Sequence, residues 1–357
     1  MVCATIDTGA LRHNLKIVRR RAPKSRVMAV VKANAYGHGL INVARALDSA
    51  DAFAVARVEE GLVLRDAGIK APVLLLEGVL DREQLDAAAG AGFELVVHSP
   101  EQIELLRAAP ATMRFKVWLK LDSGMKRLGF KTAAFRGAHA ALSALPVLQG
   151  PVNLMTHLAC ADSPDLPATA EQLMVFSSAT RSLAGERSIE NSAGLLGFPD
   201  AQADWVRPGL LLYGVSPFPG SIGADHGLKP VMTLHSHLIA VKELSVGERV
   251  GYGGDWSATR PTRLCIAAVG YGDGYARSLS SGAPVLVNGG RASLAGRVSM
   301  DMIAIDVTDL EEPPKIGDPV TLWGEGLPVE EIAVWANTIP YELLCGISQR
   351  VAVTLRA

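Results

Sequence analysis

Eight short apolar runs, each followed by a longer segment of helical periodicity, fill residues 26–214 and constrain the fold more than any other feature. This alternation is typical of parallel sheets, because each helix returns the chain to the edge where the next strand begins. Eight units in roughly 200 residues favour a TIM-type (β/α)8 barrel, with an open doubly wound sheet as the alternative. The predicted strands are 26–33, 52–57, 72–77, 93–99, 115–122, 152–158, 187–193 and 206–214.

Polar side chains stand at the carboxyl ends of several of these predicted strands. In a TIM-type barrel, these ends converge on one face, and the active site is built there. We therefore expect a candidate site that draws on Lys32, Lys120, Asp122, His157, Asn191, Ser192 and Arg207.

The segment 216–230 is dense in proline and glycine and interrupts the alternation. Beyond it, short β-rich runs are joined by glycine-rich turns, which is typical of an antiparallel sheet. We predict a barrel domain over residues 9–228 and a mainly antiparallel β domain over residues 229–357, with which residues 1–8 could pack.

Charge and hydropathy exclude several classes of partner. The 35 basic residues balance 36 acidic ones, so nothing indicates binding to nucleic acid or to an anionic membrane surface. No apolar run reaches the roughly 18 residues that a membrane span needs. Asp7 and Arg12 lie where a signal peptide would be apolar, and four widely spaced cysteines form no disulfide or metal pattern. We expect a cytoplasmic protein without a metal site that acts on small molecules.

The stretch VVKANAYGHG, residues 30–39, places Lys32 at the end of an apolar strand and directly before a run of small residues. Most lysines in such a place only lay their aliphatic stem on apolar surface and extend the ammonium into water. A desolvated lysine amine can instead be a nucleophile that forms a Schiff base. The small residues that follow Lys32 leave room for a planar ligand, which favours the second interpretation.

Nine motifs, in this order, resemble those of bacterial alanine racemases, and the resemblance covers nearly the whole chain. They are VVKANAYGHG, LDSGMKRLG, THLACAD, NSAG, RPGLLLYG, VGYGG, GYGDGY, GRVSMD and YELLCGIS.

The resemblance implies pyridoxal phosphate as the cofactor, bound through Lys32, and interconversion of L-alanine and D-alanine. It also implies Lys32 and Tyr252 as two bases, since inversion requires a proton to leave one face of the α-carbon while another arrives at the opposite face. In this family, the β domain covers the barrel mouth of a neighbouring chain. Tyr252 is therefore expected to come from the partner in a homodimer with shared sites.

The resemblance further implies a chain of contacts from Tyr252 through His157 to Arg207. Positive charge along this chain would stabilise the phenolate. Arg207 is also the implied partner of the pyridine nitrogen, and a guanidinium can only donate there. The other implied cofactor ligands are Tyr36, Asn191, Ser192, Gly209 and Leu210. Many relatives have a phosphate-binding tyrosine where this chain has Gln349, which either donates to the phosphate through its amide or leaves this contact absent.

For the substrate, the resemblance implies Arg127 and the backbone at Met300 as ligands of the carboxylate, with Asp301 beside them. Tyr271 and Tyr275 are expected at the entrance of the pocket. Lys120 resembles a lysine that is often carbamylated in relatives, where it holds the arginine in place; an unmodified lysine is the alternative.

Other functions remain open at this point. A racemase of broader substrate range and a decarboxylase-like relative would share the cofactor and the barrel. A non-catalytic pyridoxal phosphate carrier would lack the β domain and Tyr252, and a structural or regulatory descendant would have no need of Lys32 and Arg207. The sequence also does not indicate whether the reaction supplies D-alanine for peptidoglycan or serves alanine catabolism.

Overall fold

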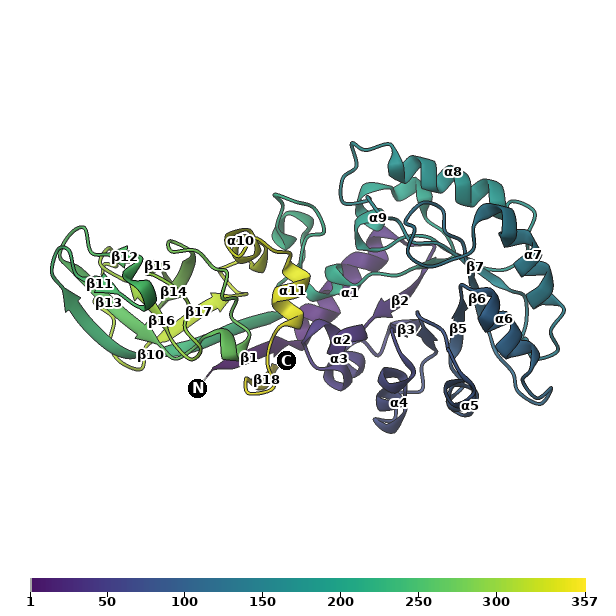
Figure 1. Ribbon diagram of the computed structural model, residues 1–357, viewed down its shortest axis with the longest axis horizontal. Helices are drawn as coiled ribbons and strands as arrows, with labels where there is room; N and C mark the ends of the chain where they lie inside the picture. The colour runs from purple at the N-terminus through teal and green to yellow at the C-terminus, as the bar shows by residue number, and fades with distance from the viewer. Residues whose placement is uncertain (1) are drawn as a thin grey trace.

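A computed structural model describes residues 2–357, and within them eight parallel strands close into a barrel (Figure 1). The predicted barrel is therefore confirmed, and the alternative prediction of an open doubly wound sheet is wrong. The barrel strands are β2 (Arg26–Val30), β3 (Ala52–Val55), β4 (Val73–Leu75), β5 (Glu94–Val97), β6 (Val117–Lys120), β7 (Asn153–Met155), β8 (Arg187–Ser188) and β9 (Trp205–Val206).

Helices surround this barrel on its outer side (Figure 1). Their apolar residues pack on the strands, which are buried almost throughout because they are covered on both faces. The helices are α1 (Thr8–Arg21), α3 (Leu40–Ala46), α4 (Val58–Asp66), α5 (Arg82–Ala91), α6 (Pro100–Arg107), α7 (Thr132–Ser143), α8 (Ala168–Thr180) and α9 (Ser192–Gly197), with short 3₁₀ turns η1 (Pro199–Ala201), η2 (Leu210–Tyr213) and η3 (Gly223–His226). The short segment α2 (Lys32–Tyr36) follows β2 and has left-handed backbone angles. In the part of the chain that the structure describes, no helix is both long and apolar enough to cross a membrane.

The last two predicted strands are much shorter than expected. Only Val206 of the run 206–214 belongs to β9, and Leu210–Tyr213 forms the 3₁₀ turn η2. Pro208 has no N–H to continue a ladder, and the chain turns at Gly209. In the run 187–193, the side chain of Asn191 accepts a hydrogen bond from the Gly194 N–H at 2.9 Å and so begins α9.

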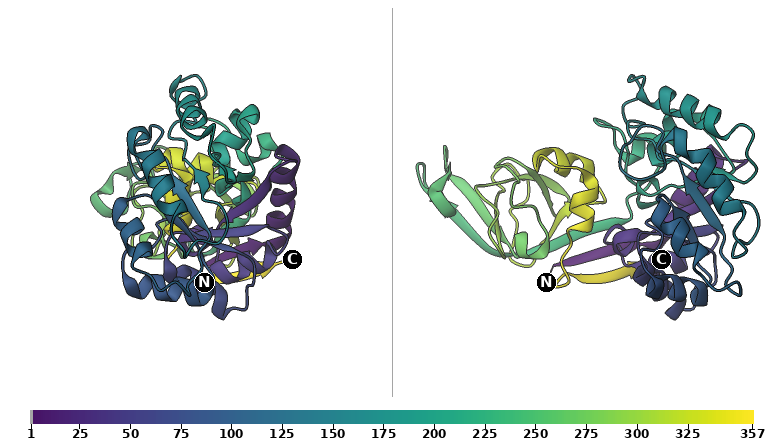
Figure 2. Two further views of the ribbon diagram at one scale, coloured as in Figure 1. Left: turned by 90° about the vertical axis from the view of Figure 1, so that its right-hand side faces the viewer. Right: turned by 45° about the vertical axis from the view of Figure 1, so that its right-hand side comes forward.

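The second part of the molecule is a mainly antiparallel sheet, as predicted. Its strand order is β13-β16-β15-β14-β17-β10-β1-β18. The exception is β1, which pairs in parallel with β18. In Figure 2, three strands of this sheet, β1, β10 and β18, extend toward the barrel. The elements are β1 (Cys3–Asp7), β10 (Met232–Leu244), β11 (Arg249–Val250), η4 (Tyr252–Gly254), β12 (Trp256–Ser257), β13 (Thr262–Ala267), η5 (Tyr271–Asp273), β14 (Pro284–Val287), β15 (Gly290–Leu294), β16 (Ile303–Asp306), β17 (Pro319–Trp323) and β18 (Ala352–Arg356).

Two helices of this part of the chain have no counterpart in the sequence prediction, α10 (Val329–Trp335) and α11 (Pro340–Cys345). Helix α11 packs against α2. A side chain at Gly37 would overlap the carbonyl of Leu344 in α11, so the glycine is required by this close approach. The β domain therefore contacts the loop that follows Lys32.

The loop after Lys32 is a left-handed turn built from residues other than glycine. Ala33, Asn34, Ala35 and Tyr36 all have φ of 53°. Such a conformation costs roughly 1–2 kcal/mol per residue, so neighbouring contacts must hold it in place. The ring Nδ1 of the buried His38 lies 3.0 Å from the Ala35 carbonyl and 2.8 Å from the Tyr36 carbonyl.

Replacing Ala33 by glycine tests the strain in this turn. Ala33 is exposed and has φ 53° and ψ 54°, so Ala33→Gly removes the steric cost of its Cβ. We expect the free energy of unfolding to rise by about 0.5–1 kcal/mol, because glycine also gains freedom in the unfolded chain. In the matched control Ala87→Gly, inside α5, it should fall by about 1 kcal/mol. Equilibrium urea unfolding measures both, and losses of equal size would show that the turn is unstrained.

Candidate active site

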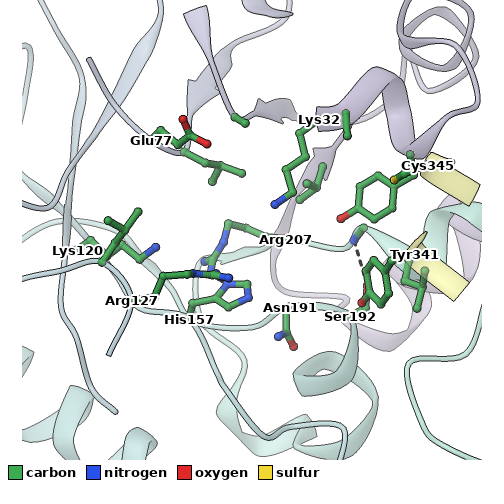
Figure 3. A pocket seen from close by; sticks show the side chains of 18 residues that line it. Lys32, Glu77, Lys120, Arg127, His157, Asn191, Ser192, Arg207, Tyr341 and Cys345 are labelled. Atoms are coloured by element: carbon green, nitrogen blue, oxygen red, sulfur yellow. Dashed lines mark hydrogen bonds between the residues drawn. The ribbon is translucent and has the colours of Figure 1, made fainter. Parts of the chain in front are cut away.

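A cavity of about 510 Å³ opens at the carboxyl ends of the barrel strands, where the sequence predicted the site. This volume is in the range of small-ligand sites. Figure 3 shows basic side chains from several strands pointing into it. Its lining includes the following residues singled out from the sequence: Lys32, Tyr36, Lys120, Arg127, His157, Asn191, Ser192, Arg207, Gly209 and Leu210.

One wall of the cavity is a narrow cradle formed by the left-handed turn, α9 and η2. The hydroxyl of Ser192 accepts hydrogen bonds from the N–H groups of Gly209 at 3.0 Å and Leu211 at 3.3 Å. A side chain at Gly209 would overlap the hydroxyl of the buried Tyr36, so any larger residue would have to displace that ring. Hydroxyl and N–H groups in such a cradle are suited to an anion such as a phosphate.

The opposite wall carries a concentration of positive charge. Lys120 and Arg127 line it together with His157 and Arg207 (Figure 3). Burial and the charges of Arg207, Arg127 and Lys32 lower the pKa of Lys120 to about 8. Burial and the same cations hold the pKa of His157 well below its usual value, so its imidazole is neutral at pH 7.

Arg207 lies between these walls and is fixed by several acceptors. Its guanidinium donates to the hydroxyl of Ser188 and, at 2.6 Å, to the carbonyl of Thr156. The Nη2 that donates to Thr156 also lies 3.3 Å from the carbonyl of Ile189 and 3.5 Å from the Nδ1 of His157. The contact between His157 and Arg207 is the one that the resemblance implied. Burial lowers the pKa of Arg207 to about 10, so it still carries its charge at pH 7.

Several of the predicted residues lie outside this cavity. Among them is Asp122, whose carboxylate accepts hydrogen bonds from the Gly124 and Lys126 N–H groups at 3.0 Å. Tyr252 is 70% exposed and belongs to η4, between β11 and β12, which lie at the end of the β domain far from the barrel (Figure 1). Tyr271 and Met300 are also exposed, and the Tyr271 N–H donates to the carbonyl of Ser299 at 3.0 Å. Asp301 accepts a hydrogen bond from Arg350 at 2.7 Å. Tyr252 is therefore separated from the cavity of its own chain.

The expected entrance position of Tyr275 needs correction, and a phosphate contact by Gln349 has no support. Tyr275 is completely buried and stacks on Trp323 with ring centroids 6.1 Å apart, so its placement at an entrance is wrong. Gln349 is exposed and does not line the cavity.

Of the cavity residues that were not singled out from the sequence, three carry a polar or ionisable side chain: Glu77, Tyr341 and Cys345. Glu77 ends the third predicted strand, so its position could have indicated it. Tyr341 and Cys345 belong to α11, which the sequence analysis did not predict. The ring of Tyr341 lies 5.8 Å from that of Tyr36.

This arrangement combines an amine, an anion cradle and a set of buried cationic donors. Lys32 follows β2 and directly precedes the left-handed turn, and its Nζ points toward Arg207 (Figure 3). An amine in such a cavity can condense with an aldehyde. The cradle and the guanidinium can hold the two ends of a phosphorylated aromatic ligand.

Comparisons with known proteins agree with this geometry. Residues 6–217 match the alanine racemase N-terminal domain and residues 231–355 the alanine racemase C-terminal domain. The alanine racemase of Shewanella woodyi is 51% identical over 99% of this chain and 98% of that protein, and that of Aeromonas hydrophila is 49% identical over 98% of this chain and 97% of that protein.

Solved structures are similar over the whole chain. The biosynthetic alanine racemase of Pseudomonas aeruginosa has a TM-score of 0.96 and 47% identity, covering 100% of this chain and 99% of that one. An alanine racemase of Bartonella henselae with covalently bound pyridoxal phosphate has a TM-score of 0.90 and 30% identity, covering 99% of each chain. On these matches over both of its parts, the chain belongs to the alanine racemase family.

Proposed function

We propose that this enzyme interconverts L-alanine and D-alanine with pyridoxal phosphate, as a homodimer in which each site uses Lys32 of one chain and Tyr252 of the partner subunit. The observation that carries the proposal is the amine of Lys32 in a cationic cavity beside an anion cradle. We place the enzyme in the cytoplasm. Its product is either D-alanine for peptidoglycan or L-alanine for catabolism.

The residues of the cavity fit this cofactor. Tyr36, Ser192 and the backbone at Gly209 and Leu210 would hold its phosphate, and a side chain at Gly209 would fill the cradle. Asn191 supports this wall by capping α9. The guanidinium of Arg207 would donate to the ring nitrogen, and Lys32 would bind the cofactor covalently. When bound, pyridoxal phosphate withdraws electrons from the substrate and acidifies its α-hydrogen.

Stereoinversion requires proton transfer on both faces of the α-carbon. Lys32 would hold or release a proton at its Nζ on one face, and Tyr252 of the partner subunit would do so at its hydroxyl on the other. A phenol is a weak base at neutral pH, so it needs positive charge nearby. The contact between His157 and Arg207 would bring that charge to the hydroxyl of the tyrosine.

The position of Tyr252 supports the dimer. Its side chain is 70% exposed at the far end of the β domain, beyond reach of its own cavity. Tyr271, Met300 and Asp301 lie on the same part of the chain, and we propose that they complete the partner's pocket. Arg127 would bind the carboxylate of alanine with the backbone at Met300 of the partner subunit.

Lys32→Ala tests the covalent link to the cofactor. Native enzyme reconstituted with pyridoxal phosphate should show the absorption band of the lysine-bound cofactor at about 420 nm, and the variant should lack it. Racemisation should fall by more than about 10³-fold, because both the link and one base are lost. Lys24→Ala, a lysine outside this cavity, is the control. A variant that keeps the band would place the link elsewhere.

Heterodimers with two different affinity tags test whether the sites are shared. A dimer of a Lys32→Ala chain with a Tyr252→Phe chain keeps one site with both residues intact, if each site takes its tyrosine from the partner. It should have about half the activity of native dimer, although both parent homodimers are inactive.

The matched control pairs a native chain with a Lys32→Ala/Tyr252→Phe chain. This dimer contains the same number of substitutions but leaves no intact shared site, so it should be inactive. The reverse result, with only the second dimer active, would mean that each site forms within one chain.

Carbamylation of Lys120 is the third test. The low pKa of about 8 leaves part of this amine unprotonated near neutral pH, and an unprotonated amine can add carbon dioxide. A carbamate would carry negative charge to the guanidinium of Arg127. Enzyme equilibrated with ¹³C-bicarbonate should show one carbamate carbon by NMR that Lys120→Met lacks. A spectrum identical to that of the variant would leave Lys120 an ordinary amine.

A further inference from the structure

The side chain of Glu190 is completely buried at the end of β8, and neither carboxyl oxygen has a hydrogen-bond partner among residues 2–357. A buried carboxylate without partners is unfavourable, so such a group is protonated, paired with a cation or functional. The proposed reaction gives this residue no role.

The charged group that acts on Glu190 is Arg207. The two residues lie on neighbouring chain segments, and the backbone N–H of Arg207 donates to the backbone carbonyl of Glu190 at 3.0 Å. Two other segments next to Glu190 direct no charge toward it. Helix α9 has no charged residue, and Arg187 of β8 donates instead to the carbonyls of Thr180 and Leu183. His157, the titratable residue that follows β7, contacts Arg207.

Arg207 in turn has no ion pair within the described chain. Its guanidinium is held by neutral acceptors, the hydroxyl of Ser188 and the carbonyls of Thr156 and Ile189. A buried arginine usually pairs with a carboxylate. Here the carboxyl that could serve is close enough to act electrostatically on Arg207 but forms no salt bridge with it.

Burial explains why the two groups stay apart. It raises the pKa of Glu190 to about 8, against the opposing effect of the Arg207 charge. At pH 7 the carboxyl is therefore mostly neutral, and the guanidinium keeps its full charge toward the cavity and toward His157.

We propose that Glu190 is a positioning residue that controls Arg207: as a neutral acid it leaves the guanidinium free to donate into the cavity, and as a carboxylate it draws the guanidinium back into an ion pair. It acts through Arg207 and touches neither substrate nor cofactor. The switch consists of one proton released to solvent. The inference rests on the proposed function, in which Arg207 faces the cofactor ring and supports the partner's tyrosine.

The pH dependence of kcat/KM for alanine tests this role with the holoenzyme. Native enzyme should lose activity above pH 8, approaching about tenfold per pH unit. Glu190→Gln mimics the neutral acid, so it should be within about twofold of native at pH 7 and should keep its activity to higher pH. Glu190→Ala leaves a cavity beside Arg207 and should lower kcat by about tenfold at pH 7, with little change in KM.

Glu330→Gln is the matched control. Glu330 is also a carboxyl whose pKa is raised by burial, but it accepts hydrogen bonds from the Ser216 and Gly223 N–H groups and lies outside the active-site cavity. This variant should keep the native alkaline limb.

Unfolding as a function of pH gives a second readout that does not depend on catalysis. The pKa of Glu190 is higher in the folded chain than the usual value near 4.5, so its contribution to stability is complete below that value and is lost as pH rises through about 8. The unfolding equilibrium of Glu190→Gln should therefore shift toward the folded state relative to native, by up to about tenfold per pH unit between pH 5 and 8.

The two readouts separate the possible failures. An alkaline limb that is the same in native enzyme and in Glu190→Gln would overturn the role of Glu190, and so would a stability difference that does not change with pH. A native enzyme that does not racemise alanine would instead contradict the proposed function.

Discussion

The pairing of the first and last barrel strands is the interaction on which the site depends. In β2 and β9, Arg26 pairs with Trp205 and Val27 with Val206, and the Val30 N–H donates to the Pro208 carbonyl at 3.0 Å. This seam closes the barrel and joins segments that are about 180 residues apart in the chain. It brings the loop after Lys32 against the loop after Arg207, so one seam aligns the nucleophile, the guanidinium and the anion cradle.

Mutual repulsion among cations is the main electrostatic property of this site. Lys32, Lys120, Arg127 and Arg207 line one cavity, where burial and then their charges lower the pKa of Lys120 and of His157. Anionic ligands relieve that repulsion, which suits a cofactor phosphate and a substrate carboxylate. The same property explains why a neutral acid beside Arg207 is useful, since an ionised one would compete with the ligand for the guanidinium.

The two parts of the chain contribute differently to the site. The barrel supplies most of the cavity, and α11 of the β domain adds Tyr341 and Cys345 to it through contact with the left-handed turn. The residues that resemble the second base and its surroundings lie on exposed loops at a distance from this cavity. Tyr252, Tyr271 and Met300 are thus accessible to a second chain, which agrees with the proposed dimer.

The sequence by itself determined the alternation of the barrel elements, favoured a closed barrel and indicated the residues at the carboxyl ends of its strands, because hydrophobic periodicity and turn chemistry are local properties. Strand ends and motifs together identified ten of the residues that line the cavity. Only the tertiary structure decided that Tyr275 is buried and that Gln349 lies outside the cavity. It also decided that α11 reaches Tyr36 and that Arg207 is the charged group that acts on the buried Glu190. Periodicity shows which face of an element is apolar, but it carries no information on how far side chains of different elements lie from one another.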